Sequence, residues 1–140
     1  MPDAAVQCVV VTPERAVLDE AVDFVALPMY DGELGILPGR APLIGRLGFG
    51  ELRIRQGTHT QSIYVDGGFV QVRANTVTVL THRAIPAENI NVTAAQETLA
   101  AAQKPATEPA AQDAQLKTQE RARAQIRVAK HNEAAPRLQL

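Results

Sequence analysis

The sequence of 140 residues has no tryptophan, a single cysteine and few aromatic side chains, and each shortage excludes a class of protein. The lone Cys8 cannot form an internal disulfide, so a disulfide-stapled scaffold is excluded. Aromatic residues make up 4% of the chain and the net charge is −1, which leaves little for base stacking or attraction to phosphates. We therefore expect no nucleic-acid partner.

Long apolar stretches are missing too. No run approaches the roughly 18 apolar residues of a membrane span, and the start Met1–Ala4 has neither the cationic nor the apolar region of a secretory signal. We expect the protein to stay where it is made. Cys8 lies in the apolar run Val6–Val11, which favours a buried thiol in a reducing compartment over a catalytic one.

Motifs for catalysis and ligand binding are lacking as well. Gly35–Arg40 resembles a phosphate loop only superficially, because the Walker A spacing, its lysine and its hydroxyl are missing. His59, His82 and His131 are far apart, with no second ligand at metal spacing, and no G-x-S-x-G occurs. The sequence predicts no catalytic residue, no metal site and no cofactor, so we expect a protein that is not an enzyme.

Up to about Pro86 the chain shows short β-branched runs separated by turn residues. The clearest is Glu51–Arg55, where Leu52 and Ile54 face the core and the charged residues face solvent. The other expected strands are Val6–Val11, Val22–Leu27, Leu34–Leu37, Ser62–Val65, Val70–Arg73 and Thr76–Leu80. Many short strands without intervening helices predict an antiparallel β-sandwich or flattened barrel.

After Pro86 the composition changes to the strong helix formers Ala, Gln, Glu, Lys and Arg. Thr93–Gln96 matches a capping box, which predicts a first helix over Thr93–Gln103. Lys104–Pro109 interrupts this helix, because each proline removes a backbone donor. A second helix is expected over Pro109–Ala134, stopped by a further proline.

The apolar positions of the two expected helices are small. They are Ala95, Leu99 and Ala102 in the first, and Ala122, Ile126 and Ala129 in the second. Such stripes allow close antiparallel packing but bury little area at about 25 cal/mol per Å². We expect a marginal hairpin that can leave its resting place.

The C-terminal part carries the positive charge. Residues 110–140 have a net charge of +3, against −2 for residues 1–86. Arg123, Arg127 and Lys130 form a stripe on the second helix, flanked by Arg121. One interpretation of such a stripe is a solvated helix face without a binding role, and the alternative is a docking edge.

The segment Asp31–Leu43 contains three glycines and two prolines in thirteen residues. Glycine adopts positive φ without penalty and proline fixes φ, so the segment predicts a short strand between two tight turns. A turn that sets strand register is one interpretation. A stiff contact surface presented by Tyr30, Asp31, Glu33 and Arg40 is the other.

This segment, together with Tyr64–Val72 and Val77–Leu80, resembles the epsilon subunit of bacterial F-type ATP synthases, over nearly the whole chain. The resemblance implies a β-sandwich followed by a C-terminal two-helix hairpin, here residues 1–86 and 87–140. It also implies a noncatalytic rotor subunit that couples ion translocation to ATP synthesis. The expected location is peripheral, on the cytoplasmic face of the bacterial inner membrane.

The resemblance further implies partners and contact residues. The expected partners are the gamma subunit, the c-ring and the alpha and beta subunits. Residues matching the ring-side loop are Tyr30, Asp31, Gly32, Glu33 and Leu34, and those matching a segment near gamma are Arg40, Ala41 and Pro42. The helices can inhibit ATP hydrolysis by contacting beta, through a stretch that here holds Arg121, Arg123, Arg127 and Lys130.

One departure from the family concerns nucleotide binding. Some members bind ATP through a pattern resembling I-D-x-x-R-A at the start of the first helix, whereas this chain has Asn91 and Ala94 at the acid and arginine positions. We therefore expect no nucleotide-binding residues. Two rival hypotheses are a free-standing β-sandwich that binds a small ligand and a hydrolase, for which the sequence offers no nucleophile.

Overall fold

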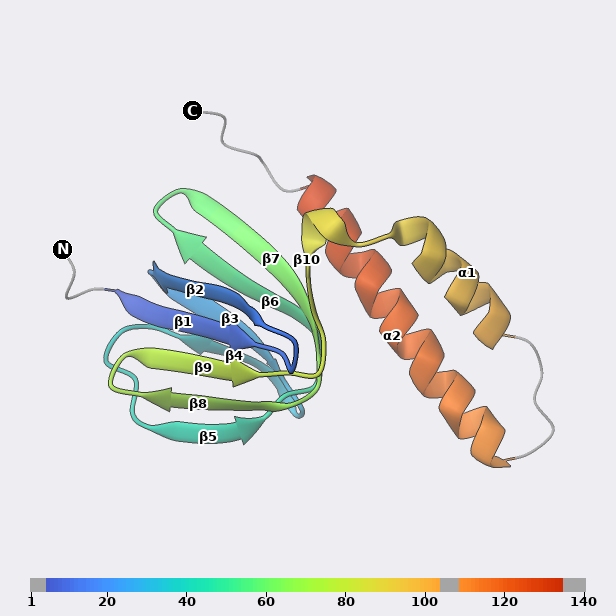
Figure 1. Ribbon diagram of the computed structural model, residues 1–140, viewed down its shortest axis with the longest axis horizontal. Helices are drawn as coiled ribbons and strands as arrows, with labels where there is room; N and C mark the ends of the chain where they lie inside the picture. The colour runs from blue at the N-terminus through green and yellow to red at the C-terminus, as the bar shows by residue number, and fades with distance from the viewer. Residues whose placement is uncertain (1–4, 104–108, 135–140) are drawn as a thin grey trace.

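The computed structural model describes residues 5–103 and 109–134, which form a β-sandwich followed by two helices (Figure 1). The strands are β1 (Val6–Val11), β2 (Ala16–Val22), β3 (Phe24–Met29), β4 (Gly32–Ile36), β5 (Leu43–Arg46), β6 (Phe49–Gln56), β7 (His59–Asp66), β8 (Phe69–Arg73), β9 (Thr76–Leu80) and β10 (Ala84–Pro86). They are followed by a short 3₁₀ helix, η2 (Ala87–Asn89), and by α1 (Val92–Ala102) and α2 (Pro109–Ala134). The predicted order of sandwich and helices is confirmed.

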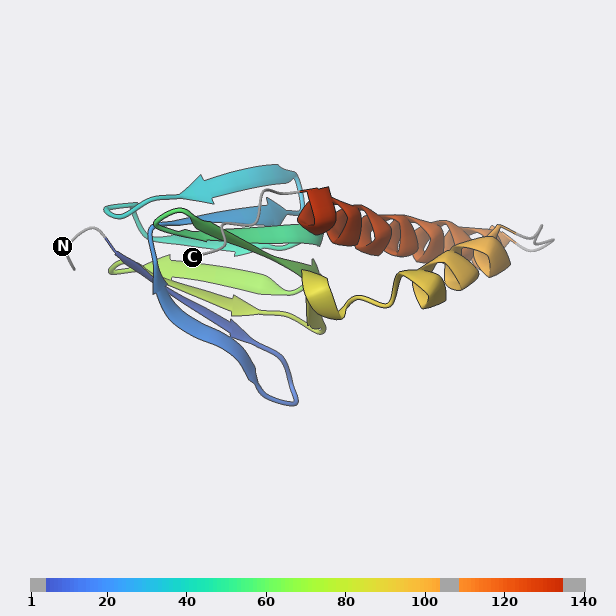
Figure 2. The ribbon, with the colours of Figure 1, turned by 90° about the horizontal axis from the view of Figure 1, so that it is seen from above.

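The strands form two sheets, with the orders β2-β1-β9-β8-β5 and β10-β7-β6-β3-β4. Figure 2 shows them as two layers, with the helices continuing from one end. The described strand pairs are antiparallel except β1 with β9, which run parallel. That pair departs from the predicted antiparallel pattern because no tight turn joins strands so remote in sequence, so nothing forces the chain to reverse between them.

Alternation of apolar and polar residues builds the core between the sheets. Leu52 and Ile54 on β6 are buried there, as predicted, and Cys8 on β1 is fully buried. The other face of β6 is less exposed than we expected. Glu51 and Arg53 are only partly accessible because the C-terminal end of α2 lies over this part of the sheet.

Several expected boundaries were wrong. The strand expected at 22–27 begins at Phe24, because a bend at Asp23 separates it from β2, and the Asp23 carboxylate accepts the Gly57 N–H at 2.6 Å. β2 itself was missed because the adjacent exposed Asp19 and Glu20 break the alternation. β5 and β10 were missed because they are only four and three residues long.

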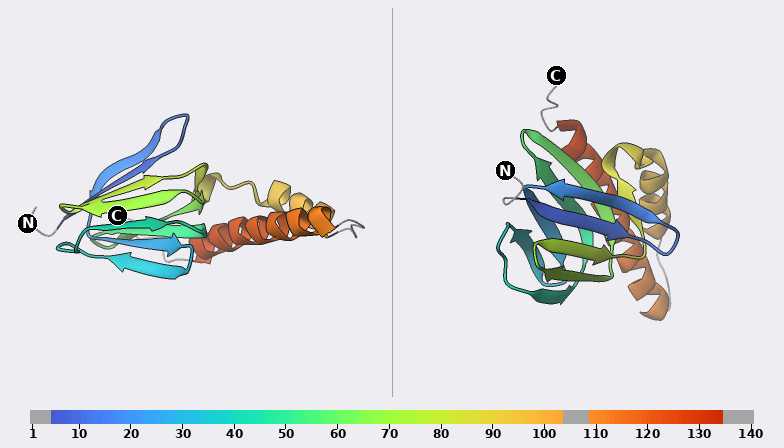
Figure 3. Two further views of the ribbon diagram at one scale, coloured as in Figure 1. Left: turned by 90° about the horizontal axis from the view of Figure 1, so that it is seen from below. Right: turned by 60° about the vertical axis from the view of Figure 1, so that its left-hand side comes forward.

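The helices pack as an antiparallel pair (Figure 3). The Gln119 amide donates to the Ala102 carbonyl at 2.7 Å. The bounds of α2 match the prediction. The capping box at Thr93 was wrong: Asn91 caps α1, its side chain accepting the Ala94 N–H at 2.9 Å. The predicted linker at 104–108 and the proline stop at Pro136 lie outside the described residues.

Candidate interaction site

The turn between β3 and β4 presents Tyr30 and Asp31 at one end of the sandwich. The Tyr30 N–H donates to the Arg46 carbonyl at 2.9 Å, and the Arg46 guanidinium lies 4.6 Å from the centroid of the Tyr30 ring. Gly32 has φ of +139°, a conformation that a side chain would strain. The exposed Tyr30 ring is therefore held by its backbone and by a cation–π contact rather than left free.

We had expected Glu33 to lie on the turn, and this was wrong. It belongs to β4, opposite Pro28, and its carboxylate pairs with Arg53 of β6 at 2.7 Å. Both side chains are partly exposed, so the pair contributes at most about 1 kcal/mol. Leu34 on the same strand packs against the core and anchors the segment. Within the ring-side set, Tyr30, Asp31 and Glu33 remain accessible.

Arg40, Ala41 and Pro42 are exposed in the connection between β4 and β5. The preceding Gly39 has φ of +85°, and its N–H donates to the Asn75 side chain at 2.7 Å, which ties this connection to the β8–β9 turn. The segment precedes β5, whereas the Arg46 that contacts Tyr30 ends it. The two predicted contact segments therefore lie at opposite ends of the sandwich.

The helix α2 docks on the outer face of β6 and β7. Tyr64 is fully buried beneath it, packed in one cluster with Ala124 and Val128. Burial, and then the nearby Asp66 carboxylate, raises the pKa of Tyr64 to about 12. Two polar contacts flank the cluster: Arg121 Nε forms an ion pair with Asp66 at 3.0 Å, and His131 Nδ1 lies 2.8 Å from a Glu51 carboxylate oxygen.

The structure separates Arg121 from the predicted basic stripe of α2. Arg121 shares one face of α2 with Ala124, Val128 and His131, because residues three or four apart align on a helix. This face meets the sandwich, so Arg121 is committed to Asp66 in the docked state. The 121-124-128-131 spacing could have shown this, but the small size of Ala124 and the apparent continuity of the arginines hid it.

The other three basic residues are exposed on a different side of α2 from Arg121. Arg123, Arg127 and Lys130 border a groove between the helices that reaches Glu51 of β6, together with the half-buried Leu99 and Ile126. Among the described residues, none of the three has an ion pair. They form an accessible basic face beside a small apolar floor.

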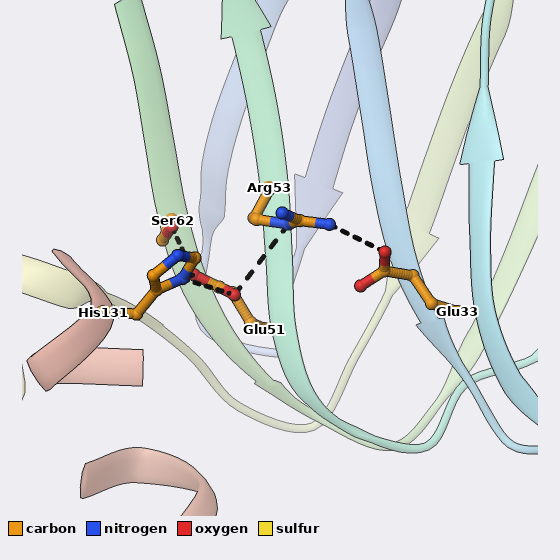
Figure 4. A network of polar contacts seen from close by, with 5 residues as sticks. All are labelled: Glu33, Glu51, Arg53, Ser62 and His131. Atoms are coloured by element: carbon orange, nitrogen blue, oxygen red, sulfur yellow. Dashed lines mark hydrogen bonds and ion pairs between the residues drawn. The ribbon is translucent and has the colours of Figure 1, made fainter. Parts of the chain in front are cut away.

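A network of polar side chains connects the sandwich to α2 (Figure 4). Glu51 is its centre: its carboxylate accepts the Ser62 hydroxyl at 2.6 Å and contacts His131 through both oxygens. Arg53 lies between the two acids, with Nη2 2.7 Å from Glu33 and Nε 3.9 Å from Glu51. Local sequence patterns did not indicate this network, since its members come from four elements.

A cleft at the start of α1 is lined by Asn91, Ala94, Arg83 and Arg121, among others. Asn91 is occupied as the helix cap. Over residues 5–103 and 109–134, no three His, Cys, Asp or Glu side chains gather as a metal site would require. Nor does any helix in that part of the chain have the length and apolar character needed to cross a membrane.

Comparison with known proteins decides the family. Residues 5–87 match the family described as ATP synthase, Delta/Epsilon chain, beta-sandwich domain. The ATP synthase epsilon chain of Rhodopirellula baltica is 50% identical over 129 residues, which cover 90% of this chain and 99% of that protein. The chain belongs to the ATP synthase epsilon family.

Other epsilon chains align over a similar span. The epsilon chain of Granulibacter bethesdensis is 39% identical over 87% of this chain and 95% of its own. Among solved structures, a chain of the Euglena gracilis mitochondrial ATP synthase is similar in fold, with a TM-score of 0.67 at 22% sequence identity. The match covers 94% of the present chain and 81% of the Euglena chain. A chain of the Tetrahymena thermophila central stalk and c-ring gives 0.68 at 16%, covering 89% of this chain and 96% of its own. At these identities the likeness shows the fold, including its two helices.

Proposed function

We propose that this epsilon-family chain is a noncatalytic rotor subunit, which couples ion translocation through a c-ring to ATP synthesis by way of gamma. The observation that supports this proposal is that two stiff, exposed segments lie at opposite ends of one rigid sandwich. A body with a contact surface at each end is suited to transmit torque between two partners. We assign no residue a catalytic, nucleotide-binding or metal-binding role.

The gamma contact is proposed for Arg40, Ala41 and Pro42, extended over the outer face of the β5-β8-β9 sheet. Ile44, Phe69 and Leu80 project there and are 77%, 60% and 53% exposed. No helix covers this face in Figures 1 and 2. Large apolar side chains grouped on an uncovered sheet face are typical of a protein–protein interface.

The c-ring contact is proposed for Tyr30, Asp31, Gly32, Glu33 and Leu34. The Tyr30 ring stacks on Arg46, and the Tyr30 N–H is hydrogen-bonded to the Arg46 carbonyl, so little conformational entropy is lost on binding. This contact would place the chain peripherally at the cytoplasmic face of a bacterial inner membrane, attached through the complex.

The regulatory contact to beta is proposed for Arg121, Arg123, Arg127 and Lys130, in a C-terminal hairpin spanning residues 87–140. Arg123, Arg127 and Lys130 are accessible in the docked state, whereas Arg121 is released from Asp66 only when α2 leaves the sandwich. The helix would then present four cations to acidic regions of the catalytic head and restrain ATP hydrolysis. Residues 1–86 would act as the independent gamma-binding and ring-binding part.

Purification of the native protein with its companions tests this function. Mass spectrometry of the complex from detergent-solubilised membranes is expected to find alpha, beta, gamma and ring subunits in fixed ratios with this chain. Substitution of Phe69 and Leu80 by serine is expected to reduce recovery of gamma, while the same exchange at the exposed Leu116 on α2 serves as a control. Recovery of the chain alone from membranes and soluble extract would overturn the proposal.

A further inference from the structure

The polar network of Figure 4 places one arginine between two acids that belong to different proposed interfaces. Glu33 lies on the ring-side strand β4, and Glu51 holds His131 of α2. We propose that Arg53 is a relay between them: the charge and ion pairing of Glu33 determine how firmly α2 docks on the sandwich. This deepens the proposed function, because Glu33 is the ring-side acid and α2 is the regulatory helix.

Geometry shows how the relay would work. Arg53 Nη2 is 2.7 Å from Glu33, whereas Arg53 Nε is 3.9 Å from Glu51 and is buried without a hydrogen-bond acceptor. The guanidinium is thus held toward Glu33 while a second acid lies just beyond hydrogen-bond distance. A change that removes the charge of Glu33, or draws it toward another cation, frees Arg53 to bind Glu51 and to satisfy its Nε.

Several hydrogen-bond donors compete for the carboxylate oxygens of Glu51. Its two oxygens already accept the Ser62 hydroxyl and face His131 Nδ1 at 2.8 and 3.0 Å. A guanidinium that moves onto Glu51 competes with the imidazole for the same lone pairs and repels it when the imidazole is protonated. The contact between His131 and the sandwich therefore weakens, and Arg121 and the apolar cluster carry more of the docking of α2.

The relay makes an unusual prediction about Arg53. If the arginine merely stabilised the sheet, its removal would loosen the structure. As a competitor for Glu51, its removal instead leaves the carboxylate to His131 and tightens the docking of α2. Glu33, by contrast, lies on β4 and pairs with Arg53 of β6 rather than with α2, so it supports docking only while Arg53 is present.

Two tyrosines make the test possible, since the chain contains only Tyr30 and Tyr64 and no tryptophan. Full-length protein labelled with 3-fluorotyrosine gives one ¹⁹F signal from the ring-side turn and one from the site beneath α2. The Tyr64 signal separates docked from undocked molecules, and Val128→Asp supplies the undocked reference. All variants carry Arg121→Gln, which removes one of the two flanking polar contacts and raises the undocked population.

On this background, Glu33→Gln is expected to lower the docked-to-undocked ratio about two- to fivefold, the size typical of exposed ion pairs. Arg53→Gln is expected to raise it about twofold. In the double variant, Glu33→Gln should have no further effect, because the intermediary is gone. Asp31→Asn removes a neighbouring acid and Arg55→Gln a neighbouring arginine on the same strand, and both should leave the ratio unchanged.

Two results with Glu33→Gln would overturn the relay: an effect no larger than that of Asp31→Asn, or an effect that persists with Arg53→Gln. A drop in docking on Arg53→Gln would also overturn it, because a structural role predicts that sign. The measurement uses the isolated subunit, so it does not depend on any ring or gamma contact. Failure of the rotor function would appear in the purification experiment instead.

Discussion

Arg121 on α2 and Asp66 at the end of β7 are 55 residues apart in sequence, yet their side chains pair at 3.0 Å. The same guanidinium lies 5.6 Å from the centroid of the Phe49 ring. One arginine therefore connects the helix to both strands on which it docks. Because it is partly exposed, this contact is weak enough to be exchanged for another partner.

Deletion of residues 87–140 is expected to leave a folded sandwich. The core between the sheets contains no helical residue, but the deletion exposes Tyr64 and Phe49, which α2 now covers. We expect a cooperative thermal transition at a midpoint lowered by several degrees, since about 1 kcal/mol shifts a domain of this size by roughly 4–8 °C. Circular dichroism measures it. Loss of the transition, or of gamma binding, would show that the division at residue 86 is wrong.

Glu33→Lys is expected to weaken ion pumping in reconstituted membranes while costing the isolated fold about 1 kcal/mol or less. The change removes the pair with Arg53 as well as the proposed ring contact. Adding Arg53→Glu restores a pair with reversed charges inside the subunit but not the acid at the ring. Pumping that recovers in this double variant, or that never falls, would contradict the ring contact.

The isolated subunit is expected to show no saturable MgATP binding at millimolar concentration. Asn91 and Ala94 replace an acid and an arginine, and hydrogen bonds to charged groups contribute about 1.5–3 kcal/mol each, so losing two weakens binding a hundredfold or more. Isothermal calorimetry measures this. The double substitution Asn91→Asp and Ala94→Arg serves as the positive control. A micromolar isotherm from the unmodified chain would contradict the prediction.

Replacing Arg123, Arg127 and Lys130 together by glutamine is expected to raise the ATPase rate of the assembled catalytic head. These residues lack ion pairs within the described chain, so their loss should not disturb docking. Lys117→Gln on the same helix is the control for charge removal. An unchanged rate in the triple variant would support a merely solvated face.

Cys8 is expected to resist alkylation at pH 8 unless the protein unfolds. Burial, followed by the nearby carboxylates of Glu20 and Asp19, raises the pKa of the thiol to about 12. The folded thiol therefore keeps its proton where the unfolded one loses it, so this site lowers stability as pH rises from about 8.5 toward 12. Iodoacetamide labelling across a urea series should follow global unfolding. Rapid labelling of the native protein would contradict it.

Local chemistry determined much of this protein. The bounds of β1, β9 and α2 followed from alternation and from prolines, because these signals act within a few residues. Glycine and proline spacing determined the turn, strand and turn around β4, and the same residues carried the family resemblance. Burial of Cys8 followed from its place in an apolar strand.

Only the tertiary structure decided which charges meet. The sequence grouped Arg121 with the other cations of α2, whereas packing turned it toward Asp66, and Glu33 was expected on a turn but lies within a strand beside Arg53. The parallel pairing of β1 with β9 was equally beyond local patterns. Contacts between residues remote in sequence depend on how sheets and helices stack, and stacking is set by the burial of the whole core rather than by any one segment.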